Sequence, residues 1–244
     1  MFPTPILSVV LPVFNESETI GPVLTELVDV LQQQWPDAWE ILAVNDGSTD
    51  MTSMRIQEVV TRHPEIRLLD LTVHAGQSGA LWMGFREARA EWIATLDADG
   101  QNDPSDLPKL MEASSGADAV FGYRTERKDT RSKKIAGQIA NKVRNGLLRE
   151  EIRDTGCATK IFRKKLLNPH SPWDGMHRFL GTLFLMQGAV IVQCPVRHRP
   201  RTAGVSKYTN RGRFIRTLRD VFAVRWLRSR YLRLPPPPKS TSAT

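Results

Sequence analysis

The sequence is poor in cysteine and has no long apolar run. Only Cys157 and Cys194 are cysteines, and no CxxC pair or Cys/His cluster accompanies them, so neither a disulfide scaffold nor a zinc site is indicated. The most apolar stretch, residues 179–192, is too short to span a bilayer, and the N-terminus lacks the features of a signal peptide. We therefore expect a cytoplasmic protein that is able to bind peripherally to the inner face of the cell membrane.

Charge is distributed unevenly along the chain. Residues 1–120 hold 6 Lys and Arg against 19 Asp and Glu, whereas residues 121–244 hold 28 basic and 7 acidic residues. A solvated basic face explains scattered charges better than it explains this segregation. The second half is therefore expected to meet nucleic acid, anionic lipid headgroups or a phosphorylated substrate. Nucleic acid is disfavoured, because zinc-finger spacing and basic motifs with interleaved aromatic residues are absent and the acidic half would repel its backbone.

Short apolar runs alternate with helical periodicity over the first 122 residues. Strands are expected at residues 6–13, 40–44, 66–71, 92–96 and 117–122, and helices at 19–34, 52–62, 76–90 and 104–113. This alternation predicts an α/β fold with a mostly parallel, mixed sheet flanked by helices. In such sheets ligands bind at the carboxyl ends of the strands.

The second half is predicted to contain basic helices. Residues 131–149 and 212–234 have amphipathic, arginine-rich patterns, and they flank expected strands at 160–162 and 190–194 and an apolar helix at about 176–187. The Pro/Ser/Thr-rich residues 235–244 are expected to be a disordered tail.

Two carboxylates emerge where the fourth expected strand ends. Asp97 and Asp99 are separated by the small Ala98, which leaves room for a ribose or sugar to approach. Mg²⁺ and Mn²⁺ favour oxygen ligands, often one or two carboxylates together with substrate phosphates. Asp99, with help from the amide of Gln101, is therefore a candidate ligand of a metal that bridges a diphosphate. Acidic turns after strands are common, so this motif alone is weak evidence.

Two more strand ends carry acidic residues. Asp46, in the segment Asn-Asp-Gly-Ser, either caps a turn or accepts hydrogen bonds from a base or ribose, and both roles are compatible. Glu16, after the first strand, is either a first-turn helix residue or a nucleotide contact. Three acidic loops concentrate negative charge, which caps alone do not explain. A cation or a hydrogen-bonding ligand would relieve that charge.

Taken in order, these motifs resemble family 2 glycosyltransferases. The closer resemblance is to the dolichyl-phosphate mannosyltransferase branch, which includes bacterial undecaprenyl-phosphate glycosyltransferases. The matching segments are residues 9–16 (VVLPVFNE), 44–50 (VNDGSTD), 76–80 (GQSGA), 96–101 (LDADGQ), 122–124 (GYR), 154–157 (DTGC), 177–179 (HRF) and 201–208 (RTAGVSKY). Each piece is common, but the combination is specific and covers about residues 6–230.

The resemblance implies a GT-A fold and an inverting hexosyltransferase. The donor would be GDP-mannose or a UDP-sugar, the acceptor a polyprenyl phosphate on the cytoplasmic membrane face, and the cofactor Mg²⁺ or Mn²⁺. The implied nucleoside contacts are Pro12, Phe14, Glu16 and Asp46, the implied metal and diphosphate residues are Asp97, Asp99 and Gln101, and the implied phosphate ligands are Arg124, Arg201 and Lys207. Asp99, Arg201 and Lys207 are the expected catalytic residues, and Ala98 and Arg131 join the substrate-binding candidates.

The expected mechanism follows from the charges. Arg201 and Lys207 would stabilise the leaving nucleoside diphosphate together with the metal. A phosphate acceptor is already anionic at neutral pH and needs no general base. His177 and His198 are accordingly interpreted as structural or phosphate-side groups.

One catalytic domain is expected over residues 1–234. It would comprise a nucleotide-sugar half (1–122), an acceptor and phosphate half (123–211) and an amphipathic helix (212–234). Many relatives continue into membrane-spanning helices, whereas this sequence ends soon after Arg233. Contact with an anionic membrane is therefore expected from the basic helices, unless they pack on the sheet. A soluble or cell-wall glycan acceptor and a non-catalytic nucleotide-sugar binder are the alternatives.

Overall fold

The computed structural model describes residues 4–125, 141–168, 170–200 and 210–232. Within them seven strands form one sheet in the order β3-β2-β1-β4-β6-β5-β7. Their bounds are β1 (Leu7–Val13), β2 (Trp39–Asn45), β3 (Ile66–Asp70), β4 (Trp92–Thr95), β5 (Ala119–Arg124), β6 (Lys160–Arg163) and β7 (Ile191–Val196). Of these seven strands, only β6 runs antiparallel to its neighbours, β4 and β5. The prediction of a mixed, mostly parallel sheet is confirmed.

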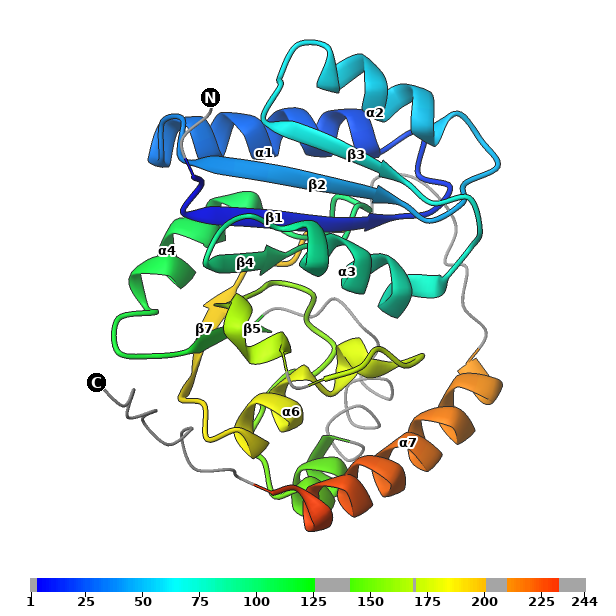
Figure 1. Ribbon diagram of the computed structural model, residues 1–244, viewed down its shortest axis with the longest axis vertical. Helices are drawn as coiled ribbons and strands as arrows, with labels where there is room; N and C mark the ends of the chain where they lie inside the picture. The colour runs from blue at the N-terminus through cyan, green and yellow to red at the C-terminus, as the bar shows by residue number, and fades with distance from the viewer. Residues whose placement is uncertain (1–3, 126–140, 169, 201–209, 233–244) are drawn as a thin grey trace, which may run out of the picture.

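Helices cover both faces of this sheet (Figure 1). One face carries α1 (Ile20–Gln34), α2 (Thr52–Val60) and α4 (Leu107–Glu112), and the other carries α3 (Gly76–Glu87) and α6 (Leu180–Met186). Short 3₁₀ helices are η1 (Pro104–Asp106), η2 (Lys164–Leu167) and η3 (Met176–Arg178), and α7 spans Asn210–Arg230. Residues 141–148 are also helical.

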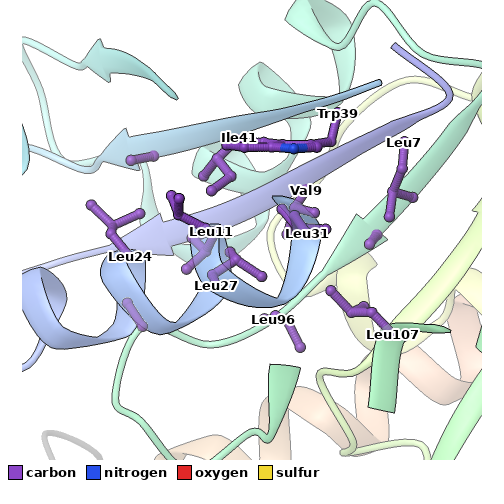
Figure 2. Close-up of a cluster of buried hydrophobic side chains, with 14 of the residues drawn as sticks. Leu7, Val9, Leu11, Leu24, Leu27, Leu31, Trp39, Ile41, Leu96 and Leu107 are labelled. Atoms are coloured by element: carbon purple, nitrogen blue, oxygen red, sulfur yellow. The ribbon is translucent and has the colours of Figure 1, made fainter. Parts of the chain in front are cut away.

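The two cores follow from the period-two alternation of strand side chains. Leu7, Val9 and Leu11 of β1 pack against α1 in the first core, which Figure 2 shows together with Trp39 and Ile41 of β2. Val10 points to the opposite face and joins the second core, with residues of α3 and α6. Because β1 and β2 are buried on both faces, their sequences are almost continuously apolar.

A glycine allows α3 to lie directly on the sheet. A Cβ atom at Gly84 would stand 2.3 Å from Cγ1 of Val10 and 3.1 Å from Cγ2 of Val44. No side chain fits at that distance, so the helix approaches β1 and β2 more closely than a larger residue would permit. This packing fixes the start of α3 beside the carboxyl ends of the strands.

A third, smaller apolar cluster attaches α7. Val221 and Val224, on its inner face, pack with Leu148 and Phe179. Figure 1 shows α7 at the end of the molecule opposite α2. In the described parts of the chain, no helix is both long and apolar enough to cross a membrane.

Most expected elements coincide with the observed ones to within a few residues. The helix expected at 76–90 ends at Glu87, because Ala88 adopts an extended conformation with ψ of 134°. The one expected at 104–113 is divided into η1 and α4. Part of the helix expected at 131–149 and the whole tail at 235–244 lie outside the described residues.

Candidate active site

Hydrogen bonds tie the loop after β1 to the loop after β2. The Asn15 amide donates to Oγ of Ser48 at 2.9 Å, and the Thr49 amide donates to Oδ1 of Asn15 at 2.8 Å. The Glu16 amide donates to Oγ1 of Thr52 at 2.9 Å. Asn15 has a φ of 51°, a left-handed conformation that asparagine tolerates better than most residues. The two loops therefore form one unit.

The same unit is attached to the loop after β4. The hydroxyl of Thr19 lies 3.0 Å from Oε2 of Glu16 and 3.0 Å from the carbonyl oxygen of Ala98. Thr19 is buried, so this contact between segments 79 positions apart is shielded from water. The three acidic strand ends that the sequence singled out thus meet at one edge of the sheet.

The Asp97–Asp99 turn is held in place by amides. Asn102, itself buried, accepts from the Asp97 backbone amide at 2.8 Å and donates to Oγ1 of Thr159 at 3.0 Å. Gln77, at the start of α3, donates to Oδ1 of Asp97 at 3.2 Å, and the Gln101 amide donates to Oδ1 of Asp99 at 3.1 Å. Both carboxylates are therefore oriented by the protein itself.

This donor set fits a hard divalent cation that also binds a diphosphate. Mg²⁺ is usually held by one or two carboxylates, with phosphate oxygens and water completing the coordination. No cluster of three or more His, Cys, Asp or Glu suited to a metal occurs among the residues that the structure describes. Asp97 and Asp99 would therefore supply part of a coordination sphere. The side-chain nitrogen of Gln101 lies 3.3 Å from the carbonyl oxygen of Arg199.

Asp46 is more deeply buried than the sequence indicates. Its exposed fraction is 2%, its Oδ1 accepts from the Ala75 amide at 2.6 Å, and its Oδ2 lies 3.0 Å from Nδ1 of His74. A Cβ atom at Gly47 would stand 2.9 Å from the His74 nitrogen, and Gly47 has a φ of 66°. The chain from β3 to α3 thus passes directly over the turn after β2.

That passage brings His74 against Phe14. The two ring centroids are 4.2 Å apart, and the rings are inclined by 35°. The His74 side chain is 53% exposed and so lies at the protein surface, whereas the Asp46 side chain that it contacts is buried. Sequence reasoning missed His74 because no motif surrounds it. The only signal was its position two residues before the GQSG segment.

Arg124 at the end of β5 is paired with a carboxylate. Its Nε and Nη2 donate to the two oxygens of Asp154 at 2.6 and 2.8 Å, a bidentate geometry that is stronger than a single contact. The pair is mostly buried. The resemblance made Arg124 a phosphate ligand and DTGC a conspicuous motif, and the structure places the two side by side.

A buried lysine interacts electrostatically with both members of this pair. Lys160 opens β6 opposite Thr95, and its ammonium group donates to the Cys157 carbonyl oxygen and faces the Phe121 ring at 5.5 Å. Burial lowers the pKa of Lys160, while the charges of Asp97 and Asp154 act in the opposite direction. Sequence reasoning read the position only as a strand residue.

The segment after β7 runs beside the Asp97–Asp99 turn. His198 pairs with Asn102 in an antiparallel bridge, and the Arg199 amide donates to the Gln101 carbonyl at 2.9 Å. Arg199 binds both carboxylate oxygens of Glu26 at 2.8 Å and lies 2.9 Å from Asp103. The bond to Glu26, reinforced by Asp103, raises the pKa of Arg199. Candidates Arg131, Arg201 and Lys207 lie outside the described residues.

His177 joins the start of α3 to η3. Its Nδ1 lies 2.6 Å from Oγ of Ser78, and that oxygen accepts from the Gly175 amide at 3.0 Å. Arg178 reaches Oγ1 of Thr217 on α7 at 3.3 Å. Pro12 lies within β1, and Ala98 is buried in the turn between the two aspartates.

Comparison with known proteins places this arrangement in a family. The family described as "Glycosyl transferase family 2" matches residues 8–170. The chain belongs to glycosyl transferase family 2. It is 34% identical over 224 residues to a dodecaprenyl-phosphate galacturonate synthase of Rhizobium johnstonii, covering 89% of this chain and 66% of the relative. It is 31% identical over 206 residues to an undecaprenyl-phosphate 4-deoxy-4-formamido-L-arabinose transferase of Pectobacterium carotovorum, covering 83% of this chain and 62% of that relative.

Solved structures agree on the fold. Glucosyl-3-phosphoglycerate synthase from Mycobacterium tuberculosis, in complex with Mg²⁺ and UDP, has a TM-score of 0.65 and 19% identity, covering 92% of this chain and 79% of that chain. A mannosyltransferase from Pyrobaculum calidifontis, in complex with GDP-Man and Mn²⁺, has a TM-score of 0.63 and 20% identity, covering 96% and 67%. The expected GT-A fold of this family 2 glycosyltransferase is confirmed. The chain spans 66% or less of the length of the two relatives described above.

Proposed function

We propose that this glycosyl transferase family 2 member moves a hexose from a nucleotide-diphosphate sugar to a polyprenyl phosphate, with inversion at the sugar. One observation carries the proposal: the three acidic strand ends are bonded into a single site around Asp97 and Asp99. The two relatives are polyprenyl-phosphate sugar transferases by name, which supports the choice of acceptor. The donor is GDP-mannose or a UDP-sugar.

We assign Asp97 and Asp99 to Mg²⁺ or Mn²⁺, with Gln101 as an accompanying residue. The bound cation would supply a positive charge that neutralises the leaving diphosphate. Gln77 bonds the Asp97 carboxylate, Asn102 holds the Asp97 backbone, and the Gln101 amide bonds Asp99, so both carboxylates are oriented before the donor arrives. Such preorganisation lowers the reorganisation needed when charge develops. Pro12, Phe14 and Glu16 would contact the nucleoside.

The phosphates on the acceptor side are assigned to basic residues of the second half. In the sequence, Arg201 and Lys207 come after the segment that pairs with Gln101 and Asn102, which supports a role for them against donor and acceptor phosphates. Arg124 and Arg131 are further candidates, and Arg124 would act while held by Asp154. The acceptor phosphate attacks as an anion, so no side chain has to remove a proton from it.

We also propose that α7 rests on an anionic membrane surface on the cytoplasmic side. Leu218, Phe222 and Trp226 recur every four residues along α7, and the latter two side chains are 54% and 62% exposed. Arg219, Arg225 and Arg230 accompany this stripe, a composition that suits an interface between lipid headgroups and acyl chains. Because α7 packs on the site's own domain, residues 1–234 are proposed to act as one catalytic unit at that surface.

The catalytic proposal is tested by following nucleotide release. With Mn²⁺ and detergent-dispersed polyprenyl phosphate, we expect one UDP- or GDP-sugar to turn over and a soluble glycan to fail as acceptor. Asp99→Asn should weaken metal-dependent donor binding on the order of 100-fold or more, because a carboxylate ligand becomes a neutral amide. The exposed Asp29→Asn on α1 is the matched control and should bind normally. Absence of turnover with every donor, together with absence of metal-dependent nucleotide binding, contradicts the proposal.

The membrane proposal is tested with vesicles of phosphatidylcholine, with and without phosphatidylglycerol. Replacing Phe222 and Trp226 together by Ser should lower binding to the anionic vesicles roughly tenfold or more, because two aromatic side chains no longer enter the interface. The matched control replaces the exposed Val190 and Val192 together by Ser. Equal binding by both double variants would show that α7 does not meet the lipid.

A further inference from the structure

We infer that His74 selects the base of the donor nucleotide and that Asp46 acts through it. This inference rests on the proposed function, since it concerns the nucleoside end of the same site. The resemblance assigned the base contact to Asp46. In the structure, Asp46 is 2% exposed and His74 covers it with a side chain that is 53% exposed. The polar group that a nucleoside meets there first is the imidazole.

The partners of His74 determine which ring nitrogen carries its proton. Nδ1 lies 3.0 Å from the Asp46 carbonyl oxygen and 3.0 Å from Oδ2 of the same residue. Both oxygens can only accept, so Nδ1 is the protonated nitrogen. In the neutral ring Nε2 then carries a lone pair and accepts hydrogen bonds. Among the described residues, no hydrogen bond to Nε2 is formed.

The position of the ring is also fixed. Oδ1 of Asp46 accepts from the Ala75 amide at 2.6 Å, and this bond holds the backbone of the residue that follows His74. Phe14 packs against the ring at a centroid distance of 4.2 Å in a tilted arrangement, and Gly47 provides the space in which the His74 backbone lies. A ring held by a carboxylate, an aromatic neighbour and a fixed backbone can offer a directional acceptor at little entropic cost.

An acceptor on this partly exposed ring would distinguish two classes of base. Uracil and guanine carry a ring N–H beside a carbonyl, and this N–H can donate to Nε2. Cytosine and adenine carry an unprotonated ring nitrogen at the corresponding edge, so two acceptors would face each other. A site built around one hydrogen bond rejects the analogue that cannot make it. His74 therefore favours uridine and guanosine donors over cytidine and adenosine donors.

The test measures Mn²⁺-dependent binding of UDP, GDP, CDP and ADP by calorimetry. The unchanged protein should bind UDP or GDP most tightly. His74→Phe keeps a ring against Phe14 but removes the acceptor, so affinity for the preferred nucleotide should fall about tenfold while weak binding of CDP and ADP stays the same. His63→Phe, at a histidine between α2 and β3, is the matched control and should change neither. Thermal unfolding verifies that each variant is folded.

A second variant separates positioning from direct contact. In Asp46→Asn the side-chain oxygen can still accept from the Ala75 amide and the backbone carbonyl can still accept from Nδ1, but the second acceptor of Nδ1, the carboxylate oxygen Oδ2, is lost, so the ring is held less firmly. We expect the preference for UDP or GDP over CDP to shrink about tenfold, and adding His74→Phe to cause no further loss.

The outcomes separate the two levels of proposal. If the unchanged protein binds none of the four nucleotides, the proposed function and the role of His74 both fail. If it prefers UDP or GDP and His74→Phe keeps that preference, only the role of His74 is overturned. Equal affinity for all four nucleotides in the unchanged protein overturns it as well.

Discussion

The two halves of the molecule are held together by different chemistry. In the acidic half, hydroxyl and amide groups such as Thr19, Ser48 and Asn102 connect the strand-end loops. In the basic half, guanidinium groups make the connections: Arg124 binds Asp154, and Arg144 lies 3.0 Å from the buried Glu150. Arginines 178, 199, 225 and 228 also bond to neighbouring protein groups.

This difference changes how the uneven distribution of charge along the sequence is interpreted. The excess of basic residues after position 120 suggested a surface that binds an anion, yet many of these arginines support the fold. Conversely, the acidic loops concentrate carboxylates, and neutral amides orient Asp97 and Asp99 among them. Charge therefore supports the structure in much of the second half, whereas in the first half our proposal assigns Asp97 and Asp99 to a bound cation.

The largest expected effect comes from breaking an arginine pair. Arg124→Ala should lower the free energy of unfolding by about 3 kcal/mol, because the mostly buried Asp154 carboxylate loses its bidentate partner. Urea denaturation measures this change. Arg55→Ala is the control, since the Arg55–Glu58 pair is about half exposed and should contribute less than about 0.5 kcal/mol. Similar losses for both variants would contradict the structural use of charge in the second half.

A smaller loss of stability is expected when one of the hydroxyl hydrogen bonds between the strand-end loops is removed. Thr19→Val should cost about 1 kcal/mol of unfolding free energy and should also weaken nucleotide binding, because the Ala98 carbonyl loses its buried donor. Thr25→Val removes an exposed hydroxyl bonded to Gly21 within α1 and serves as the control. Denaturation and calorimetry are measured together. Unchanged binding by Thr19→Val would show that the tie between the loops does not shape the site.

The smallest expected effect concerns how the free energy of unfolding depends on pH. The backbone amide of Val190, with Lys165 adding its charge, lowers the pKa of Asp118 below its ordinary 3.8 despite partial burial. Its folded pKa lies below its unfolded one, so its stabilisation is complete above the unfolded value and is lost as pH falls through the folded value. Unfolding in urea at about pH 3 and about pH 7 should show a smaller difference for Asp118→Asn than for the unchanged chain. If the two proteins show the same difference between these pH values, the Asp118 carboxyl does not contribute to the pH dependence of stability.

Much of the fold was predictable because its signals are local. Alternating apolar runs identified β1 to β5, and period-two patterning explains why β1 contributes Val9 to one core and Val10 to the other. The carboxyl ends of parallel strands meet at one edge, so the grouping of Glu16, Asp46 and Asp97 also followed from the pattern. The sequence also indicated β6 as a strand. Its antiparallel pairing with β4 and β5 could not be predicted, because those strands are distant in the sequence.

The rest of the site depends on contacts between distant segments. Nothing around His74 in the sequence indicates that its ring meets Phe14, 60 positions earlier, because that meeting requires the β3–α3 chain to cross Gly47. Lys160 reads as a strand residue until β6 inserts between β4 and β5 and buries it. The orientation of Asn102 depends on Thr159, which lies just before β6 and 57 positions later in the chain.

By itself, the sequence determined the class of fold, the edge of the sheet to which we assign the chemistry and the carboxylates placed there, because periodicity and strand-end position act over short distances. Tertiary structure decided which of those groups are buried and which partners they bond. It buried Asp46 behind His74, paired Arg124 with Asp154 and fixed Asp97 through Gln77 and Asn102. Burial and pairing are properties of groups that meet only after the sheet is assembled, so no local pattern contains them.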